Sequence, residues 1–186
     1  MSAKTSRKSP IVSFKCSQAK ALNAGLRLHL LELAQQLPSK KTNQPNGKSF
    51  FDNKWITPTD LYRSDNEHIQ ELVHFAETDV NAFIRQNSPQ VTLAIRSMWC
   101  MVSEPGMVGR RHNHVGRISG SYYVDAGESG PMGGQLEFYE DEKSSHPTFS
   151  IPPKTGMLYV FPSKLQHSVS TYTGDRPRIV IAMNFA

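Results

Sequence analysis

The chain has 186 residues, a hydrophobic content of 38% and a formal net charge of +5, values typical of one soluble globular domain with its own core. No apolar stretch approaches the length of a membrane span, and the N-terminus has no hydrophobic signal core. Two cysteines, Cys16 and Cys100, are too few for a disulfide framework, so we expect a reducing, cytoplasmic setting.

The positive charge is concentrated at the start of the chain. Residues 1–48 contain nine lysines and arginines and a single acidic residue, Glu32, whereas the remainder has twelve basic and fifteen acidic residues. A nucleic-acid-binding surface needs a basic face interleaved with aromatic residues, and the sequence has no such pattern. We therefore interpret residues 1–9 as a disordered basic tail, and we do not expect nucleic acid as a partner.

The first elements after the tail are a short strand and a helix. Residues 11–14, Ile-Val-Ser-Phe, are rich in β-branched and aromatic residues, as in a strand. Ser17 can cap a helix over residues 18–37, in which leucines recur at helical spacing. The residues that follow, 38–50, are polar and predict a loop.

A second helix is predicted from about Asp65 to Gln86. Apolar residues recur on one of its faces, and the sequence around Pro89 ends it. An amphipathic helix buries its apolar face against another element. We therefore expect both helices to pack against a sheet.

Beyond Pro89 the chain becomes typical of β-structure. Short runs rich in β-branched and aromatic residues alternate with glycine, proline and polar turns. Helices followed by a sustained series of strands predict an α+β fold, in which helical support at 10–89 braces a two-sheet sandwich or barrel at 90–186 within one domain. The predicted strands are residues 91–102, 116–124, 135–139, 148–151, 157–161, 168–172 and 178–185.

Two histidines separated by one residue, His112 and His114, indicate a metal site. On a strand both would face the interior of a barrel, because alternate side chains share a face. His167 lies between two predicted strands, where a barrel could bring it across to this pair. Neutral imidazoles bind iron, zinc, copper and nickel, so residue type alone does not choose the metal. We interpret the remaining histidines as surface or hydrogen-bonded residues: His29, His68, His74 and His146.

A series of motifs in a fixed order accompanies these histidines. The chain reads His112-Asn113-His114, then Ser119-Gly120-Ser121-Tyr122-Tyr123-Val124, Gly133-Gly134-Gln135-Leu136, Phe161-Pro162-Ser163-Lys164-Leu165-Gln166-His167, and a last strand from Arg178 to Phe185. In this order the sequence resembles the superfamily of iron(II)- and 2-oxoglutarate-dependent oxygenases, and is most similar to its branch of small bacterial and phage oxygenases related to prolyl hydroxylases. The resemblance extends from about Trp99 to the C-terminus, and more weakly to residues 53–56. It implies a double-stranded β-helix core, the jelly-roll of cupin-like proteins.

The resemblance also implies iron(II) as cofactor and 2-oxoglutarate as cosubstrate. His112 and His167 would bind the iron, Arg178 would pair with the far carboxylate of 2-oxoglutarate, and Tyr123 would donate a further hydrogen bond to the cosubstrate. A guanidinium suits this role, because its planar fork binds a carboxylate through two parallel hydrogen bonds. The implied enzyme is an oxidoreductase: a dioxygenase that uses dioxygen to hydroxylate an unidentified substrate and releases succinate and carbon dioxide.

The sequence departs from this family at the third metal ligand. The usual site has two histidines and a carboxylate, with the acid two residues after the first histidine, where this chain has His114. An imidazole in place of a carboxylate makes the iron site more positive, which favours a dianionic cosubstrate. We interpret His114 as a ligand in a three-histidine site. The alternatives are that Asp125 or Glu137 reaches the metal instead, or that the site is degenerate.

Two other functions fit parts of the same pattern. A three-histidine iron dioxygenase of the cupin type, acting without 2-oxoglutarate, explains His114 better and Arg178 less well. A jelly-roll binding module without catalysis would keep only the fold. The sequence does not identify the substrate, because variable loops provide substrate contacts in such barrels. An edge strand could support a homodimer.

Overall fold

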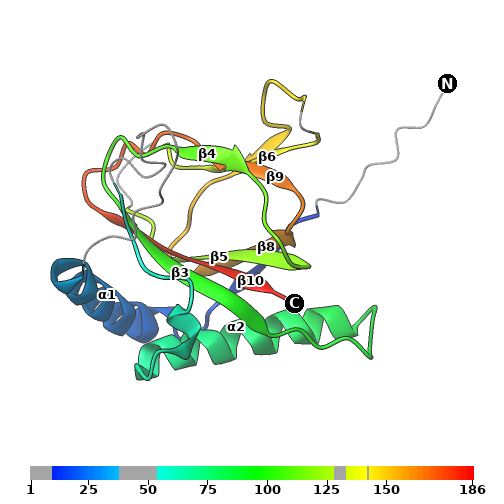
Figure 1. Cartoon of the computed structure of the whole chain (residues 1–186), viewed down its shortest axis with the longest axis horizontal. Coiled ribbons are helices and arrows are strands. Elements are labelled where there is room, and N and C mark those ends of the chain that lie inside the picture. The colour runs from blue at the N-terminus through cyan, green and yellow to red at the C-terminus, as the bar shows by residue number, and fades with distance from the viewer. Residues whose placement is uncertain (1–9, 38–53, 128–132, 142) are drawn as a thin grey trace.

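The computed structural model describes residues 10–37, 54–127, 133–141 and 143–186. Within these ranges two sheets face each other, and two helices cover the outer face of the larger sheet (Figure 1). This arrangement is the α+β jelly-roll that the sequence predicts. The predicted tail at 1–9 and the predicted loop at 38–50 lie outside the described residues.

The predicted helices and strands occur in the expected order, and two short strands that were not predicted, Lys54–Ile56 and Gly109–His112, join them. The helices are α1 (Ala19–Gln36), α2 (Glu67–Arg85) and one turn of 3-10 helix at Leu61–Arg63. None of these is long and apolar enough to cross a membrane, a finding that holds for the described ranges. The strands are β1 (Val12–Lys15), β2 (Lys54–Ile56), β3 (Ile95–Ser103), β4 (Gly109–His112), β5 (Ile118–Asp125), β6 (Leu136–Tyr139), β7 (Phe149–Ile151), β8 (Met157–Pro162), β9 (Gln166–Val169) and β10 (Arg178–Phe185).

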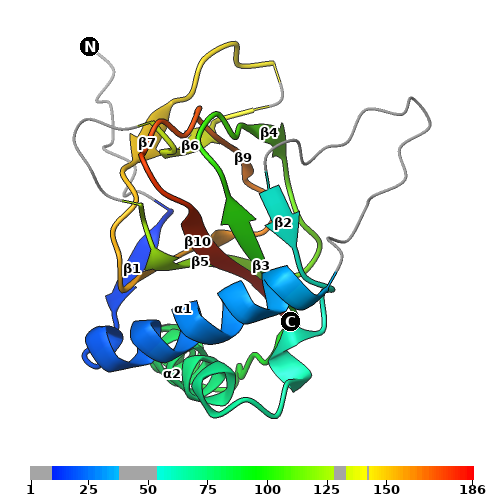
Figure 2. The ribbon, with the colours of Figure 1, turned by 90° about the vertical axis from the view of Figure 1, so that its left-hand side faces the viewer.

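The two sheets have different strand orders. The larger sheet runs β1-β8-β5-β10-β3-β2, and the smaller sheet runs β4-β9-β6-β7. Neighbouring strands pair antiparallel in both sheets. Figure 2 shows the edge strands β2 and β4 on one side of the sandwich, and β1 and β7 on the other.

The helices bury their apolar faces against the larger sheet. Leu22, Leu26 and Leu30 of α1, together with Ile69 and Leu72 of α2, are at most 1% exposed. They form one cluster with alternate residues of the central strands. Burying a side chain of this size stabilises the fold by about 1.5–3 kcal/mol. Because the helices occupy one face of the sheet, the other residues of each strand face the smaller sheet.

Strand β10 shows this division along its length. Every residue of β10 is buried, since both of its faces are covered. Ile179 and Ile181 belong to the cluster under the helices, whereas Val180 packs with Tyr123 between the sheets. Side chains alternate along a strand. Arg178 therefore shares the face of Val180 and points into the space between the sheets.

The starts of both helices differ from the predicted ones. Gln18, and not Ser17, precedes the first turn of α1, and its side chain makes no capping hydrogen bond. The second helix begins at Glu67, because the side chain of Asn66 accepts hydrogen bonds from the backbone N–H groups of His68 and Ile69. Asparagine is among the best N-cap residues. Local hydrogen bonding thus moves this helix start from the predicted Asp65.

The predicted strand at 168–172 is also displaced. The strand observed there, β9, spans Gln166–Val169 and ends before Tyr172. The Tyr172 side chain is fully buried, and its hydroxyl donates a hydrogen bond to the backbone oxygen of Arg176 at 2.6 Å. The guanidinium carbon of Arg178 lies 5.3 Å from the centre of the Tyr172 ring. This tyrosine leaves the sheet and supports the arginine instead.

Candidate metal centre

Two of the three predicted histidines lie opposite each other in the smaller sheet. His112 is the last residue of β4, and His167 is its partner on β9 in the antiparallel register. The centres of their rings are 4.4 Å apart. His167 is 4% exposed and packs against Phe161, while His112 lies at the exposed edge. The register of one strand pair therefore brings these imidazoles together.

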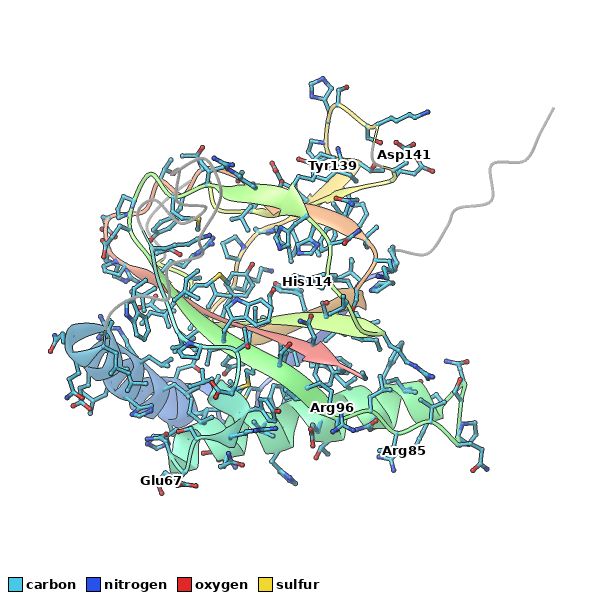
Figure 3. All side chains as sticks on the ribbon, viewed as in Figure 1. Glu67, Arg85, Arg96, His114, Tyr139 and Asp141 are labelled. Carbon is cyan, nitrogen blue, oxygen red and sulfur yellow. The ribbon has the colours of Figure 1, made fainter. Side chains whose placement is uncertain are left out.

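His114 joins this pair from a loop. The prediction that one strand carries both His112 and His114 is wrong at its second residue, because β4 ends at His112. The backbone N–H of His114 donates to the carbonyl of Ser163 at 2.8 Å, which holds the loop against the end of β8. Its ring centre lies 4.7 Å from that of His112 and 5.0 Å from that of His167. Figure 3 shows His114 between the two sheets.

The three rings present converging nitrogen atoms. One ligand nitrogen from each ring can be chosen so that all lie within 4.8 Å of one another. Nδ1 of His112 lies 2.7 Å from the carbonyl oxygen of Arg110, and Nδ1 of His167 lies 2.9 Å from that of Leu165. A carbonyl only accepts, so Nδ1 carries the proton in both rings and the lone pair of Nε2 is free for a metal.

The environment keeps these imidazoles neutral. Burial, followed by the effect of the neighbouring His112, lowers the pKa of His167 to about 3. Burial, followed by the effect of His112, lowers the pKa of His114 to about 4. Burial also lowers the pKa of His112. Neutral imidazole is the metal-binding form, so the cluster is ready to bind a cation at neutral pH.

The two acidic residues considered as alternative ligands lie elsewhere. Asp125 makes ion pairs with Arg27 at 3.4 Å and Arg176 at 3.3 Å. Glu137 accepts a hydrogen bond from the hydroxyl of Ser168 at 2.7 Å, on the face of the smaller sheet opposite to His167. Among the residues that the structure describes, the cluster that could hold a metal contains histidines alone, and His29, His68, His74 and His146 are not part of it.

Arg178 is a buried cation on the inner face of the larger sheet. It is 3% exposed, and its Nη1 donates to the carbonyl of Gly134 at 2.7 Å. Its Nε has no hydrogen-bond partner within the described ranges. An unsatisfied donor on a buried charge is costly. The Nε–H of Arg178 can therefore donate a hydrogen bond to an acceptor atom of a ligand.

The two consecutive tyrosines of β5 point in opposite directions. Tyr122 faces the helices, where its hydroxyl donates to Oδ1 of Asn23 at 2.6 Å. Tyr123 faces the smaller sheet and packs edge-on against Tyr159, with ring centres 5.8 Å apart. Burial raises the pKa of Tyr123, while the charge of Arg178 acts in the opposite direction. The hydroxyl of Tyr123 is therefore a neutral donor close to Arg178.

Two residues that the sequence did not single out lie beside Arg178. Ser103 is its partner on β3, and Lys54 is the partner of Ser103 on β2. Burial lowers the pKa of Lys54 to about 8, and the charge of Arg178 contributes to this shift. In the sequence, the signal for this position is a single polar residue, Lys54, before the apolar residues Trp55 and Ile56. Three residues are too few for that signal to stand alone.

Known proteins resemble this chain in both sequence and fold. Residues 97–184 match the family model described as "Putative 2OG-Fe(II) oxygenase". No curated protein sequence matches the chain. Among solved structures, a prolyl-4-hydroxylase of Pseudomonas putida is 19% identical over 94% of this chain and 91% of its own, with a TM-score of 0.67.

Two further solved structures have the same arrangement. A prolyl hydroxylase of Trichoplax adhaerens, in complex with a hypoxia inducible factor oxygen degradation domain peptide fragment, is 14% identical over 96% of this chain and 84% of its own, with a TM-score of 0.69. A viral collagen prolyl hydroxylase from Paramecium Bursaria Chlorella virus-1, in a 2OG complex, is 13% identical over 95% of both chains, with a TM-score of 0.59. These likenesses confirm the fold, the double-stranded β-helix. The family match runs from β3 to β10 and includes the histidine cluster and Arg178, so this part of the chain is similar to the 2OG-Fe(II) oxygenases.

Proposed function

We propose that the protein is an iron(II)- and 2-oxoglutarate-dependent dioxygenase that hydroxylates an unidentified substrate and releases succinate and carbon dioxide. The observation that carries the proposal is the convergence of three neutral imidazoles in a barrel whose wall also holds a buried, incompletely bonded arginine. The family match supports the same reaction class.

The residues present fit the metal that the family implies. His112, His114 and His167 would hold iron(II) as nitrogen ligands, and imidazole is a ligand type that suits iron. The carbonyls of Arg110 and Leu165 fix two of the rings, so each offers Nε2 without rearrangement. Such outer hydrogen bonds orient the rings and make the ligands more basic.

The residues also fit the cosubstrate. The Nε of Arg178 has no partner among the described residues, and the side chain lies on the inner face of the larger sheet, so it would take the far carboxylate of 2-oxoglutarate. Tyr123 would donate a second hydrogen bond from β5. Iron(II) with 2-oxoglutarate and dioxygen supplies the oxidising chemistry, in which one oxygen atom enters the substrate and the other enters succinate. The protein's own contribution is to orient the reactants and to exclude competing reactions.

An anaerobic titration tests the proposal directly. Protein loaded with iron(II) is titrated with 2-oxoglutarate, and the absorption spectrum is followed for a metal-to-ligand charge-transfer band. We expect a saturable band, and succinate after air is admitted. Protein with His167 replaced by alanine serves as the negative control. If wild-type protein binds iron but shows neither the band nor succinate, the proposed function is wrong.

One observation favours a second candidate. His114 stands where the usual oxygenase has an acid, and a cupin-type dioxygenase with three histidines works without 2-oxoglutarate. Arg178 has no evident role in that alternative. Arg178→Ala separates the two candidates: it should weaken 2-oxoglutarate binding strongly in the first and leave oxygen consumption with a thiol substrate unchanged in the second.

A further inference from the structure

Three polar side chains form a row across the larger sheet. Ser103 on β3 lies opposite Arg178 on β10 and opposite Lys54 on β2. The residues next to them, Trp55, Val102 and Ile179, pack in the cluster under the helices. Because side chains alternate, Lys54, Ser103 and Arg178 point the other way, toward the smaller sheet. A hydroxyl thus stands between two cations on the inner wall of the barrel.

Two atoms of this row are unsatisfied. Ser103 is 1% exposed, and within the described ranges its Oγ has no hydrogen-bond partner. The Nε of Arg178, on the neighbouring strand, is in the same state. A buried donor without an acceptor is destabilising, and two such donors side by side are explained by a ligand that satisfies both. An acid group carries two oxygen atoms and suits this pair of donors.

Lys54 extends the row toward the imidazoles. The charge of Arg178 lowers the pKa of Lys54, so the two cations lie close enough to interact. Its strand β2 lies on the same side of the sandwich as β4, the strand that ends in His112 (Figure 2). Two desolvated cations close together repel each other. An anion between them turns this repulsion into attraction.

Building on the proposed function, we propose that Ser103 and Lys54 act with Arg178 as one slot for the far carboxylate of 2-oxoglutarate. The slot then selects 2-oxo acids that end in a second acid group. 2-Oxopentanoate, which has a methyl group in place of that carboxylate, would leave the row without an acceptor. Neither Ser103 nor Lys54 touches the metal in this assignment, so their contribution is confined to this one end of the cosubstrate.

Calorimetric titration of the zinc-loaded protein measures this contribution without turnover. 2-Oxoglutarate and 2-oxopentanoate are titrated into wild-type protein, Ser103→Ala, Lys54→Met and Lys54→Arg. Ser13→Ala and Lys15→Met, exposed residues of edge strand β1, are the matched controls. Ser103→Ala should raise the Kd for 2-oxoglutarate about 10-fold, and Lys54→Met about 10- to 100-fold. The Kd for 2-oxopentanoate should change less than about threefold, and Lys54→Arg should restore most of the affinity for 2-oxoglutarate.

The outcomes separate this inference from the proposed function. If 2-oxoglutarate binds wild-type protein and both variants equally, the slot is wrong and the proposed function stands. If the variants weaken both oxo acids alike, the row does not read the far carboxylate and the slot is again wrong. If zinc-loaded wild-type protein binds no 2-oxoglutarate, the proposed function and the slot fail together.

Discussion

His112 and His167 face each other across one antiparallel strand pair, and their ring centres are 4.4 Å apart. Their Nδ1 atoms both donate to a backbone carbonyl two residues earlier in the chain, at Arg110 and Leu165. The pair is thus symmetric in its hydrogen bonding, and each ring presents the same nitrogen to the space between them.

Removing one of these rings should cost most of the metal affinity. Replacing His112 or His167 by alanine removes a nitrogen ligand, and we expect the Kd for zinc or iron(II) to rise about 100-fold or more. Calorimetric titration of metal into metal-free protein measures the change. His146→Ala, in an exposed loop, should bind metal like the wild type. Equal affinities for all four proteins would contradict a metal site at this cluster.

His114→Asp places the usual acidic ligand in this chain. We expect the metal to remain bound, because a carboxylate is also a ligand for iron. The site becomes less positive, so dianionic 2-oxoglutarate should bind ~3- to 10-fold more weakly to the metal-loaded variant. Competitive titration with a fixed metal reports both constants. Tighter cosubstrate binding by this variant would show that the charge of the centre does not govern affinity.

Acid should destabilise the metal-free protein. The pKa values of His114 and His167 in the folded state are about 4 and about 3, below the ordinary histidine value of 6.5. The unfolded chain therefore takes up protons first, and the free energy of unfolding falls as the pH drops from about 6.5 toward 4. Above pH 7 these rings are neutral in both states and add no pH dependence. Urea unfolding from pH 8 to pH 4.5 gives the curve.

A double variant isolates this effect of the two rings. Replacing His114 and His167 by asparagine removes both titrating groups, so the unfolding curve should become flatter between pH 6.5 and 4. An unchanged slope would assign the acid sensitivity to other groups.

The position of the Arg178 guanidinium should depend on a glycine at residue 134. Its φ is +78°, and a Cβ there would lie 2.6 Å from Nη1 of Arg178. Gly134→Ala should therefore displace the guanidinium and weaken 2-oxoglutarate binding at least ~10-fold. Gly106→Ala is the control, because Gly106 has a φ of 88° but is exposed. Both variants carry backbone strain of about 1–2 kcal/mol, so only the loss of cosubstrate affinity should distinguish them.

Asn81 should be important for stability alone. Its side chain is 6% exposed, donates to the carbonyl of Leu93 at 2.8 Å and accepts from the backbone N–H of Leu93 at 2.8 Å. Asn81→Ala leaves two buried backbone groups unpaired, which should lower the free energy of unfolding by about 2–4 kcal/mol. Urea denaturation measures this change. Asn87→Ala, at an exposed site after α2, should have nearly the wild-type free energy of unfolding. An equal decrease in that variant would show that the two hydrogen bonds of Asn81 are not the cause.

The elements that the sequence predicts well are those with a local pattern. The leucines of α1 and the apolar face of α2 recur at helical spacing, and β10 contains the β-branched run Ile179–Ile181. The strands β2 and β4 have three and four residues, so their periodicity carries little information. Their existence depends on pairing with β3 and β9, far along the chain, which no local window contains.

In the candidate site, too, some features could be predicted from local sequence and others depend on tertiary structure. The motif order predicts which histidines belong together, and the structure brings the three of them together, while their role as iron ligands stays a prediction. The place of His114 depends on a hydrogen bond to Ser163 beyond the strand end, which spacing cannot reveal. The row of Lys54 and Ser103 beside Arg178 follows from the register of three strands. Register is a tertiary property.

Among the residues that the structure describes, β4, which ends in His112, is an edge strand of the smaller sheet and pairs with β9. Border strands open most readily in amide hydrogen exchange. A cation bound to both His112 and His167 would link β4 to β9 and slow the exchange of the β4 amide hydrogens. Without that cation the barrel would then open first along β4, so metal binding and the local stability of this edge are coupled.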